Sequence, residues 1–168
     1  HLVLCDTNVL ATLSPQVEAE GWAEIIKYGM IRSQELINFL LENTPGTDIE
    51  WVIAHCVSIK RDVVAQDEQD NAVRQVLNFG HTIGHAIERC SGYSLYHGEG
   101  VAMGMAIMTR ACARQKKCPP ACWTVLETLL DKYHLPKTTD KSVDELLEAA
   151  QMDGAGTIRG YIHIVLPV

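Results

Sequence analysis

The chain has 168 residues, of which 47% are hydrophobic and 21% charged, and its formal net charge is -7. This length and composition are ordinary for one globular domain with its own hydrophobic core. The negative charge provides no overall basic field for nucleic acid. No apolar run reaches the roughly 18 residues that a membrane-spanning helix needs. We therefore expect neither nucleic acid nor a membrane as a partner.

The cysteines and the first residues indicate a cytoplasmic fragment. Six cysteines are dispersed along the chain, and only Cys118 and Cys122 are close in sequence. No second close pair completes a structural zinc site, so we expect free thiols in a reducing cytoplasm. The chain opens on the apolar residues 2–5 without an initiating methionine, and this start is not a signal peptide. We interpret the chain as part of a longer protein.

Helical periodicity dominates the first two thirds of the chain. Apolar residues recur with helical spacing from Val17 to Met30. Residues 47–50, Thr-Asp-Ile-Glu, have the form of a capping box and open a second helical segment that reaches Val64. We expect a third helix over about residues 70–90 and a fourth over about 98–116. The fourth is rich in small residues and methionine, so it should pack closely in the core.

The last third continues in the same way. Pro119 and Pro120 separate the fourth helix from a fifth through residues 123–133, which Pro136 prevents from continuing. A second capping box, Ser-Val-Asp-Glu at residues 142–145, precedes another helical stretch. Only residues 161–166 have the pattern of a strand. The sequence thus predicts one mainly helical, all-α domain over residues 1–168 with a short C-terminal strand.

Three of the seven histidines indicate metal chemistry. His81, His85 and His97 lie within seventeen residues, each beside a glycine. His81 and His85 would share one face of a helix, and His97 could approach that face from a second element. Neutral imidazole is a common ligand of divalent transition metals. The clustering favours a metal site over three unrelated structural histidines.

Charged residues earlier in the chain could complete such a site. Glu24 stands in an apolar stretch with Lys27 three residues later, so it either pairs with Lys27 or faces a cation such as a metal; spacing alone favours the ion pair. Lys60 belongs to a polar run that is mostly helix surface. Arg74 precedes His81 by seven residues, roughly on the same face of the expected third helix. A cation beside a metal suits a ligand with a carboxylate or phosphate.

Three segments, in this order, resemble the 3-dehydroquinate synthase family. They are residues 23–29 (Ala-Glu-Ile-Ile-Lys-Tyr-Gly), residues 77–88 (Leu-Asn-Phe-Gly-His-Thr-Ile-Gly-His-Ala-Ile-Glu) and residues 97–99 (His-Gly-Glu). The resemblance covers nearly the whole chain. It implies the C-terminal domain of the dehydroquinate synthase-like fold, whose NAD-binding half precedes this region and is absent here.

The resemblance also implies a ligand set and a chemistry. The family's catalytic metal, Zn2+ or Co2+, maps onto Glu24, His81 and His97, which replaces the pairing of His81 with His85. The metal would polarise a substrate hydroxyl and carbonyl as a Lewis acid, with one coordination position open. Acceptors that orient the ligand histidines are expected nearby, and Glu88 and Glu99 are candidates.

The remaining family positions concern the substrate. Lys27, Asn78 and His85 fall at catalytic positions, and Lys60 and Arg74 at positions that bind a sugar-acid phosphate. The implied reaction is a lyase step of the shikimate pathway, in aromatic amino acid biosynthesis. It converts 3-deoxy-D-arabino-heptulosonate 7-phosphate to 3-dehydroquinate and phosphate, with transient oxidation by NAD. A homodimer is compatible with the family.

Two departures from the family keep alternatives open. Without the NAD-binding half, we expect the fragment alone to be inactive. Asp153-Gly154-Ala155 stands where the family usually has Asp-Lys-Lys, so two cations are missing. The alternatives are another sugar-phosphate cyclase or metal-dependent polyol dehydrogenase of the same superfamily, or a non-catalytic metal-binding module. One carboxylate with two histidines argues against a closed structural zinc site, which has four protein ligands and is rich in cysteine.

Overall fold

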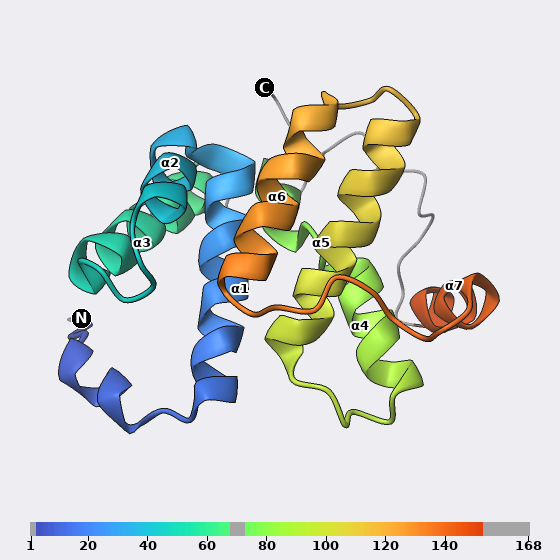
Figure 1. Ribbon diagram of the computed structural model, residues 1–168, viewed down its shortest axis with the longest axis horizontal. Coiled ribbons are helices and arrows are strands. Elements are labelled where there is room, and N and C mark those ends of the chain that lie inside the picture. Colours follow the sequence, from blue (N-terminus) through green and yellow to red (C-terminus); the bar gives the residue numbers. More distant parts are fainter. Residues whose placement is uncertain (1–2, 68–72, 153–168) are drawn as a thin grey trace.

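The computed structural model describes residues 3–67 and 73–152, and this part of the chain is helical without a strand (Figure 1). The prediction of a mainly helical domain is confirmed for these residues. The expected strand at 161–166 and the departure at 153–155 lie outside the described residues. The elements are η1 (Thr7–Thr12), α1 (Pro15–Arg32), α2 (Gln34–Glu42), α3 (Ile49–Gln66), η2 (Val73–Asn78), α4 (His81–Cys90), α5 (His97–Arg114), α6 (Pro120–Lys132) and α7 (Val143–Met152).

Helix α5 is the centre of the arrangement and packs against α1, α4 and α6 (Figure 1). Its side chains from Val101 to Ala106 are all buried, as the small residues of this segment predict. Helices α2 and α3 pack on α1 at one side of the molecule, and α7 packs on α4 at the other. Helix α5 therefore places its first residue, His97, between α1 and α4.

Helices α4 and α5 approach so closely that the glycine positions at their contact leave no room for a side chain. A Cβ atom added to Gly104 of α5 would overlap the carbonyl oxygen of Gly80, which directly precedes α4. One added to Gly84 of α4 would lie 2.9 Å from the carbonyl carbon of Gly100. Such backbone contact is available only where the Cβ is missing. The glycines thus let the two histidine-bearing helices meet.

The prediction of one helix over about residues 70–90 is wrong, because the described residues 73–90 form two elements. The 3-10 helix η2 ends at Asn78, α4 begins at His81, and between them Gly80 has φ +82°. This left-handed conformation favours glycine and interrupts an α-helix. Arg74 therefore does not lie on the helix that carries His81, contrary to the prediction.

The two expected capping boxes have different outcomes. At α7, the backbone N–H of Glu145 donates to Ser142 Oγ (3.3 Å), and that of Ser142 donates to Glu145 Oε2 (2.8 Å), as predicted. At α3 the prediction is wrong, because the helix begins at Ile49 after Asp48, which has φ +44° and makes no side-chain cap. Helix α2 was not predicted; Ser33 caps it directly after α1 ends, accepting from the N–H of Leu36 (3.1 Å).

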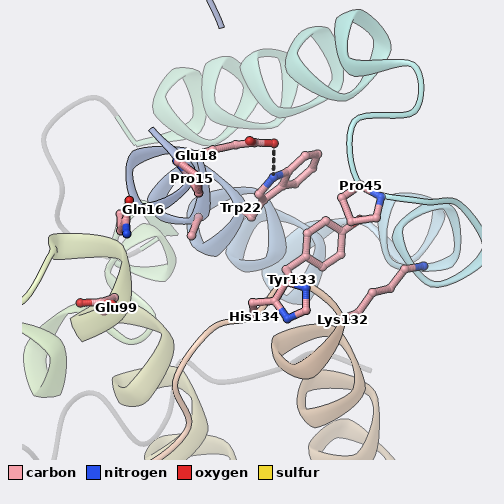
Figure 2. A pocket seen from close by; sticks show the side chains of 10 residues that line it. Pro15, Gln16, Glu18, Trp22, Pro45, Glu99, Lys132, Tyr133 and His134 are labelled. Carbon is pink, nitrogen blue, oxygen red and sulfur yellow. Dashed lines mark hydrogen bonds between the residues drawn. The ribbon is translucent and has the colours of Figure 1, made fainter. Parts of the chain in front are cut away.

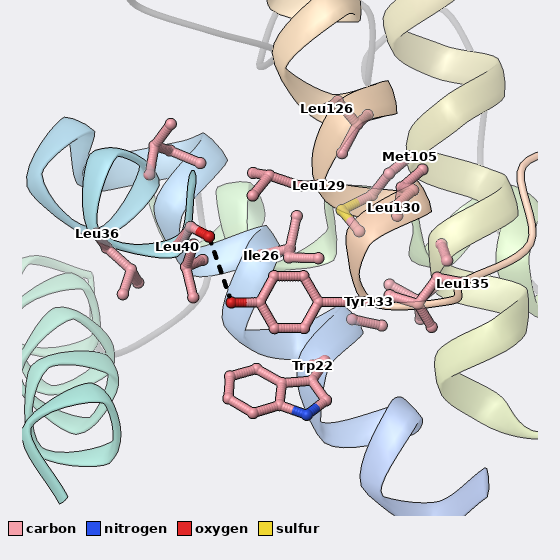
Figure 3. Close-up of a cluster of buried hydrophobic side chains, with 14 of the residues drawn as sticks. Trp22, Ile26, Leu36, Leu40, Met105, Leu126, Leu129, Leu130, Tyr133 and Leu135 are labelled. Carbon is pink, nitrogen blue, oxygen red and sulfur yellow. Dashed lines mark hydrogen bonds between the residues drawn. The ribbon is translucent and has the colours of Figure 1, made fainter. Parts of the chain in front are cut away.

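A buried cluster joins α1, α2, α5 and α6 (Figure 3). The rings of Trp22 and Tyr133 lie 4.7 Å apart, and the Tyr133 hydroxyl donates to the Leu40 carbonyl (3.5 Å). The Lys132 ammonium donates to the carbonyls of Leu40 and Leu41 at the end of α2, each at 2.7 Å. The ring contact with Tyr133 joins α1, the helix that carries Glu24, to the end of α6. Among the described helices, none is both long and apolar enough to cross a bilayer.

Candidate metal and substrate site

Three helices bring one carboxylate and two imidazoles together. Glu24 comes from α1, His81 from the start of α4 and His97 from the start of α5. One donor atom from each lies within 4.8 Å of the others, and the rings of His81 and His97 are 5.2 Å apart. The three residues that the family resemblance implies as metal ligands therefore share one location, although they span 74 positions of sequence.

The two oxygens of Glu24 have different surroundings. Oε2 accepts from Lys27 Nζ at 2.7 Å, so the ion pair expected from the spacing is present. Oε1 is buried, makes no hydrogen bond within the described part of the chain, and lies 3.4 Å from Nε2 of His81. A buried carboxylate oxygen usually has a hydrogen-bond donor. Ion pair and metal ligand are thus compatible roles for this one side chain.

His81 is held as a neutral imidazole. Its Nδ1–H donates to the Phe79 carbonyl at 3.2 Å, which leaves a lone pair on Nε2. Burial, followed by the positive charge of Lys27, lowers the pKa of His81 to about 4. At neutral pH, two lone-pair donors, Nε2 and Glu24 Oε1, thus face each other at 3.4 Å. A cation between or beside them would remove this repulsion, so the residues present fit a divalent metal.

His97 is oriented by Glu88. Its Nδ1 lies 3.0 Å from Glu88 Oε1, and Gly100 makes room for that carboxylate, since a Cβ at Gly100 would lie 2.8 Å from the same oxygen. A carboxylate that accepts from a ligand histidine fixes its ring and its tautomer. Of the two expected acceptors, Glu88 therefore takes this position. Glu99 instead accepts from the backbone N–H of Tyr96 at 3.1 Å.

Four further predicted site residues, Lys27, Lys60, Arg74 and Asn78, lie on α1, α3 and η2. Lys27 is buried, and burial lowers its pKa; Glu24 opposes this shift and the charge of Lys60 adds to it, which places Lys60 within electrostatic reach. Arg74 lies in η2, where its backbone N–H donates to Asp67 Oδ2 (3.1 Å), and Asn78 ends η2. Since η2 packs on α1 and α3, the element that carries Arg74 and Asn78 contacts the two helices that carry Lys27 and Lys60.

His85 completes a group of three imidazoles. Its ring lies 5.5 Å from that of His81 and 5.6 Å from that of His97. It therefore lies beside His81 and His97, two of the three residues of the candidate ligand set. His81 and His85 are four residues apart on α4 and therefore share one face of this helix, as the sequence predicted.

Sequence reasoning missed Glu20. This residue lies one turn before Glu24 on α1, and its Oε2 accepts from the backbone N–H of Gly98 at 3.5 Å. It thereby connects α1 to the first turn of α5, next to His97. A carboxylate near a helix N-terminus is favourable because unpaired N–H groups point outward there. The i,i+4 spacing to Glu24 was the one available signal.

A separate pocket of 310 Å³ lies between the start of α1, the end of α6 and the start of α5 (Figure 2). Trp22 and Tyr133 form part of its wall, and Trp22 Nε1 donates to Glu18 Oε1 at 3.2 Å. Its lining includes none of the three residues of the proposed ligand set. A metal needs donor atoms that converge on one point, and the converging donors Glu24, His81 and His97 lie outside this pocket. The pocket is therefore not the candidate site for a metal-bound substrate.

Comparison with known proteins places the chain in a family. Residues 21–155 match the family model described as 3-dehydroquinate synthase C-terminal, and this range contains Glu24, His81 and His97. The 3-dehydroquinate synthase of Enterococcus faecalis (strain ATCC 47077 / OG1RF) is 44% identical over 169 residues, covering 98% of this chain and 47% of that protein. That of Methylacidiphilum infernorum is 43% identical over 154 residues, covering 90% and 43%.

Two solved structures share the fold. One is 2-epi-5-epi-valiolone synthase from Streptomyces hygroscopicus with NAD+ and Zn2+ bound (TM-score 0.77, 24% identity, 88% of this chain and 43% of that one). The other is 2-deoxy-scyllo-inosose synthase with carbaglucose-6-phosphate, NAD+ and Co2+ (TM-score 0.72, 24% identity, 87% and 42%). The chain spans about half the length of the curated relatives it matches. It belongs to the family of 3-dehydroquinate synthase C-terminal domains.

Proposed function

We propose that this chain is the metal- and substrate-binding part of a 3-dehydroquinate synthase. The complete enzyme would convert 3-deoxy-D-arabino-heptulosonate 7-phosphate to 3-dehydroquinate and phosphate, in the shikimate pathway of the cytoplasm. The observation that carries the proposal is the pair of facing donors, Glu24 Oε1 and His81 Nε2, with His97 beside them. The family to which the chain belongs supports the reaction.

The ligand set would be Glu24, His81 and His97. A divalent ion held there, Zn2+ or Co2+, would supply Lewis-acid polarisation of a substrate hydroxyl and carbonyl. Three protein ligands leave a position for substrate, as in other catalytic zinc sites. Lys27 would hold the carboxylate of Glu24 in position through their 2.7 Å ion pair, and Glu88 would hold the ring of His97.

The other residues would recognise and position the substrate. Lys60 and Arg74 would bind its carboxylate and phosphate, because a guanidinium or ammonium pairs strongly with such anions. Asn78 and His85 would contact its hydroxyl groups beside the metal, with His85 able to hold or pass a proton. The hydride step needs NAD. We propose that NAD is bound mainly outside this chain, so that the chain alone does not turn over.

A second candidate is another sugar-phosphate cyclase with the same fold. One sequence observation favours it, namely Gly154-Ala155 in place of the family's usual two lysines. The solved structures with this fold carry the names of other cyclases. Lys60 and Arg74 favour a phosphorylated acid over the neutral substrate of a polyol dehydrogenase. A non-catalytic metal-binding module is the remaining alternative.

A chimera tests the reaction. The chain is joined to the remaining half of the Enterococcus faecalis relative and assayed with NAD and Zn2+ on the heptulosonate phosphate, glucose 6-phosphate and glycerol. We expect turnover of the first substrate only, and none by the chain alone. A folded, NAD-binding chimera that turns over only another substrate would support the second candidate, and one inactive on all three would support the module.

Substitutions test the residues within this chimera. Lys60→Met should raise KM for the heptulosonate phosphate, whereas Lys117→Met, at an exposed position of the same charge, should not. Glu24→Gln should weaken binding of Zn2+ at the first site and abolish turnover, whereas Glu42→Gln, at an exposed position, should leave both unchanged. A Glu24→Gln variant that binds Zn2+ with unchanged affinity would contradict the proposed ligand set.

A further inference from the structure

A second set of metal-binding side chains lies beside the first and shares one residue with it. His85, Glu88 and His97 each offer a donor atom, and these atoms lie within 4.8 Å of one another. His85 and Glu88 are three residues apart on α4 and therefore neighbours on its surface. The ring of His97 approaches them from α5, with its centroid 5.6 Å from that of His85. The set is again two imidazoles and one carboxylate.

The surroundings of this set suit an ion that arrives from solvent. The His97 side chain is 44% exposed, whereas the Glu88 side chain is only 14% exposed. Glu88 is thus a largely desolvated carboxylate next to an accessible imidazole. Mixed nitrogen and oxygen donors of this kind suit Zn2+, Co2+ and Ni2+ rather than Mg2+ or Ca2+, which prefer oxygen alone.

His97 cannot serve both sets at once. A neutral imidazole has one lone pair, on Nδ1 or on Nε2. In the folded chain, Nδ1 lies 3.0 Å from Glu88 Oε1, so it carries the proton and Nε2 carries the lone pair. For an ion to bind beside Glu88, the proton must move through solvent from Nδ1 to Nε2. The hydrogen bond to Glu88 is then lost, so this binding is the weaker of the two.

We propose that His85, Glu88 and His97 form a second, weaker site for a divalent transition metal, which competes with the first site for His97. The proposal rests on the proposed function in one respect, that Glu24, His81 and His97 form the first site. At excess metal, an ion at the second site would bind His85 and His97, and His97 would no longer be a ligand of the first site. Excess Zn2+ would therefore inhibit the complete enzyme.

The experiment separates the two sites in this 168-residue chain by Zn2+ binding alone. Equilibrium dialysis gives affinity and stoichiometry, and NMR of the histidine rings shows which imidazoles bind. The variants are Glu24→Gln, Glu24→Gln with Glu88→Gln, and Glu24→Gln with Glu99→Gln. Glu99 is the matched control, because it is also a carboxylate near His97 but accepts from the Tyr96 backbone.

Glu24→Gln should weaken Zn2+ binding by at least about 100-fold, more than the usual effect of changing an outer partner, yet leave one bound ion per chain. In this variant, Zn2+ should move the ring signals of His85 and His97 and not those of His81. Adding Glu88→Gln should weaken the remaining binding by at least a further roughly 10-fold, whereas adding Glu99→Gln should not. Helical circular dichroism checks that each variant is folded.

Other outcomes overturn the proposal. If Glu24→Gln binds no Zn2+, the second set is not a site. If adding Glu88→Gln leaves Zn2+ binding by the Glu24→Gln chain unchanged, the remaining ion is held by the three imidazoles instead. The same holds if the His81 ring signal moves together with those of His85 and His97. Failure of the proposed function looks different, because wild-type and Glu24→Gln chains would then bind Zn2+ equally well while the response to Glu88→Gln persists.

Discussion

The two carboxylate oxygens of Glu24 lie next to different groups, the ammonium of Lys27 and the imidazole of His81. Lys27 takes Oε2, and Oε1 remains buried beside His81 without a hydrogen bond among the described residues. An unpaired buried carboxylate oxygen costs about 1–3 kcal/mol, so its presence needs a cause. A bound cation is the cause that fits the neighbouring donors.

Glu88 provides a prediction about metal affinity. Glu88→Gln replaces the carboxylate that fixes the ring of His97. As a single substitution, we expect it to weaken binding of the first Zn2+ by about 10–100-fold. Equilibrium dialysis measures the effect, with Glu99→Gln as the control. An unchanged affinity would mean that α5 alone orients His97.

Lys27 provides a prediction about His81. Lys27→Met removes a positive charge that, together with burial, lowers the pKa of His81 from its ordinary value to about 4. The pKa of His81 in the metal-free chain should therefore rise, because the imidazolium form is no longer repelled. NMR titration of the ring measures it. Lys117→Met should leave the pKa unchanged; an unaltered pKa in Lys27→Met would show that burial alone sets it.

At the scale of elements, the site depends on how closely α4 and α5 approach. The glycines of the two helices permit backbone contact, and the left-handed Gly80 follows η2 so that α4 can begin at His81. The rings of His81 and His97, one at the start of each helix, then lie 5.2 Å apart. A side chain at this contact would move one ligand away from the other.

Gly104→Ala tests the contact between these helices. Its Cβ would overlap the Gly80 carbonyl, so we expect a loss of about 1–3 kcal/mol in the free energy of unfolding, with weaker Zn2+ binding. Urea denaturation and dialysis measure the two effects. Gly21→Ala on α1 is the control, because an added Cβ there would meet no atom within 4 Å beyond its chain neighbours and its own helix backbone, and it should stabilise the chain by about 0.4–1 kcal/mol. Equal effects at both positions would contradict the close contact.

At the scale of the molecule, folding holds His81 in a place where its charged form is unfavourable. Its pKa is about 4 in the folded chain, below the ordinary value of 6.5. Because the unfolded chain binds the proton more readily, stability contributed by a neutral His81 is present above about pH 6.5 and falls as pH decreases toward about 4.

His81→Gln tests this pH dependence. The metal-free wild-type chain should lose more free energy of unfolding between pH 6.5 and pH 4 than the variant, since glutamine has no proton to gain. Urea titrations at several pH values measure the difference. His134→Gln, which changes an exposed histidine, should follow the wild type. Parallel curves for wild type and His81→Gln would show that His81 is not buried as described.

The helical class and the candidate site residues were predictable from the amino-acid sequence alone. Apolar periodicity and the Ser142–Glu145 capping box depend on neighbours within four residues, so they can be read from the chain alone. The segments around Glu24, His81 and His97 indicated the family by their residues and their order, and the match over residues 21–155 confirmed it.

The packing of the helices determines how these residues meet. It ended η2 at Asn78, inserted α2, and gave Glu88 rather than Glu99 to His97. The start of α2 has a local cause in the Ser33 cap, but the contact of Glu88 with His97 depends on the approach of α4 to α5, two segments whose packing local patterns do not show. The convergence of residues 24, 81 and 97 is therefore a product of packing, whereas the residues themselves are a property of the sequence.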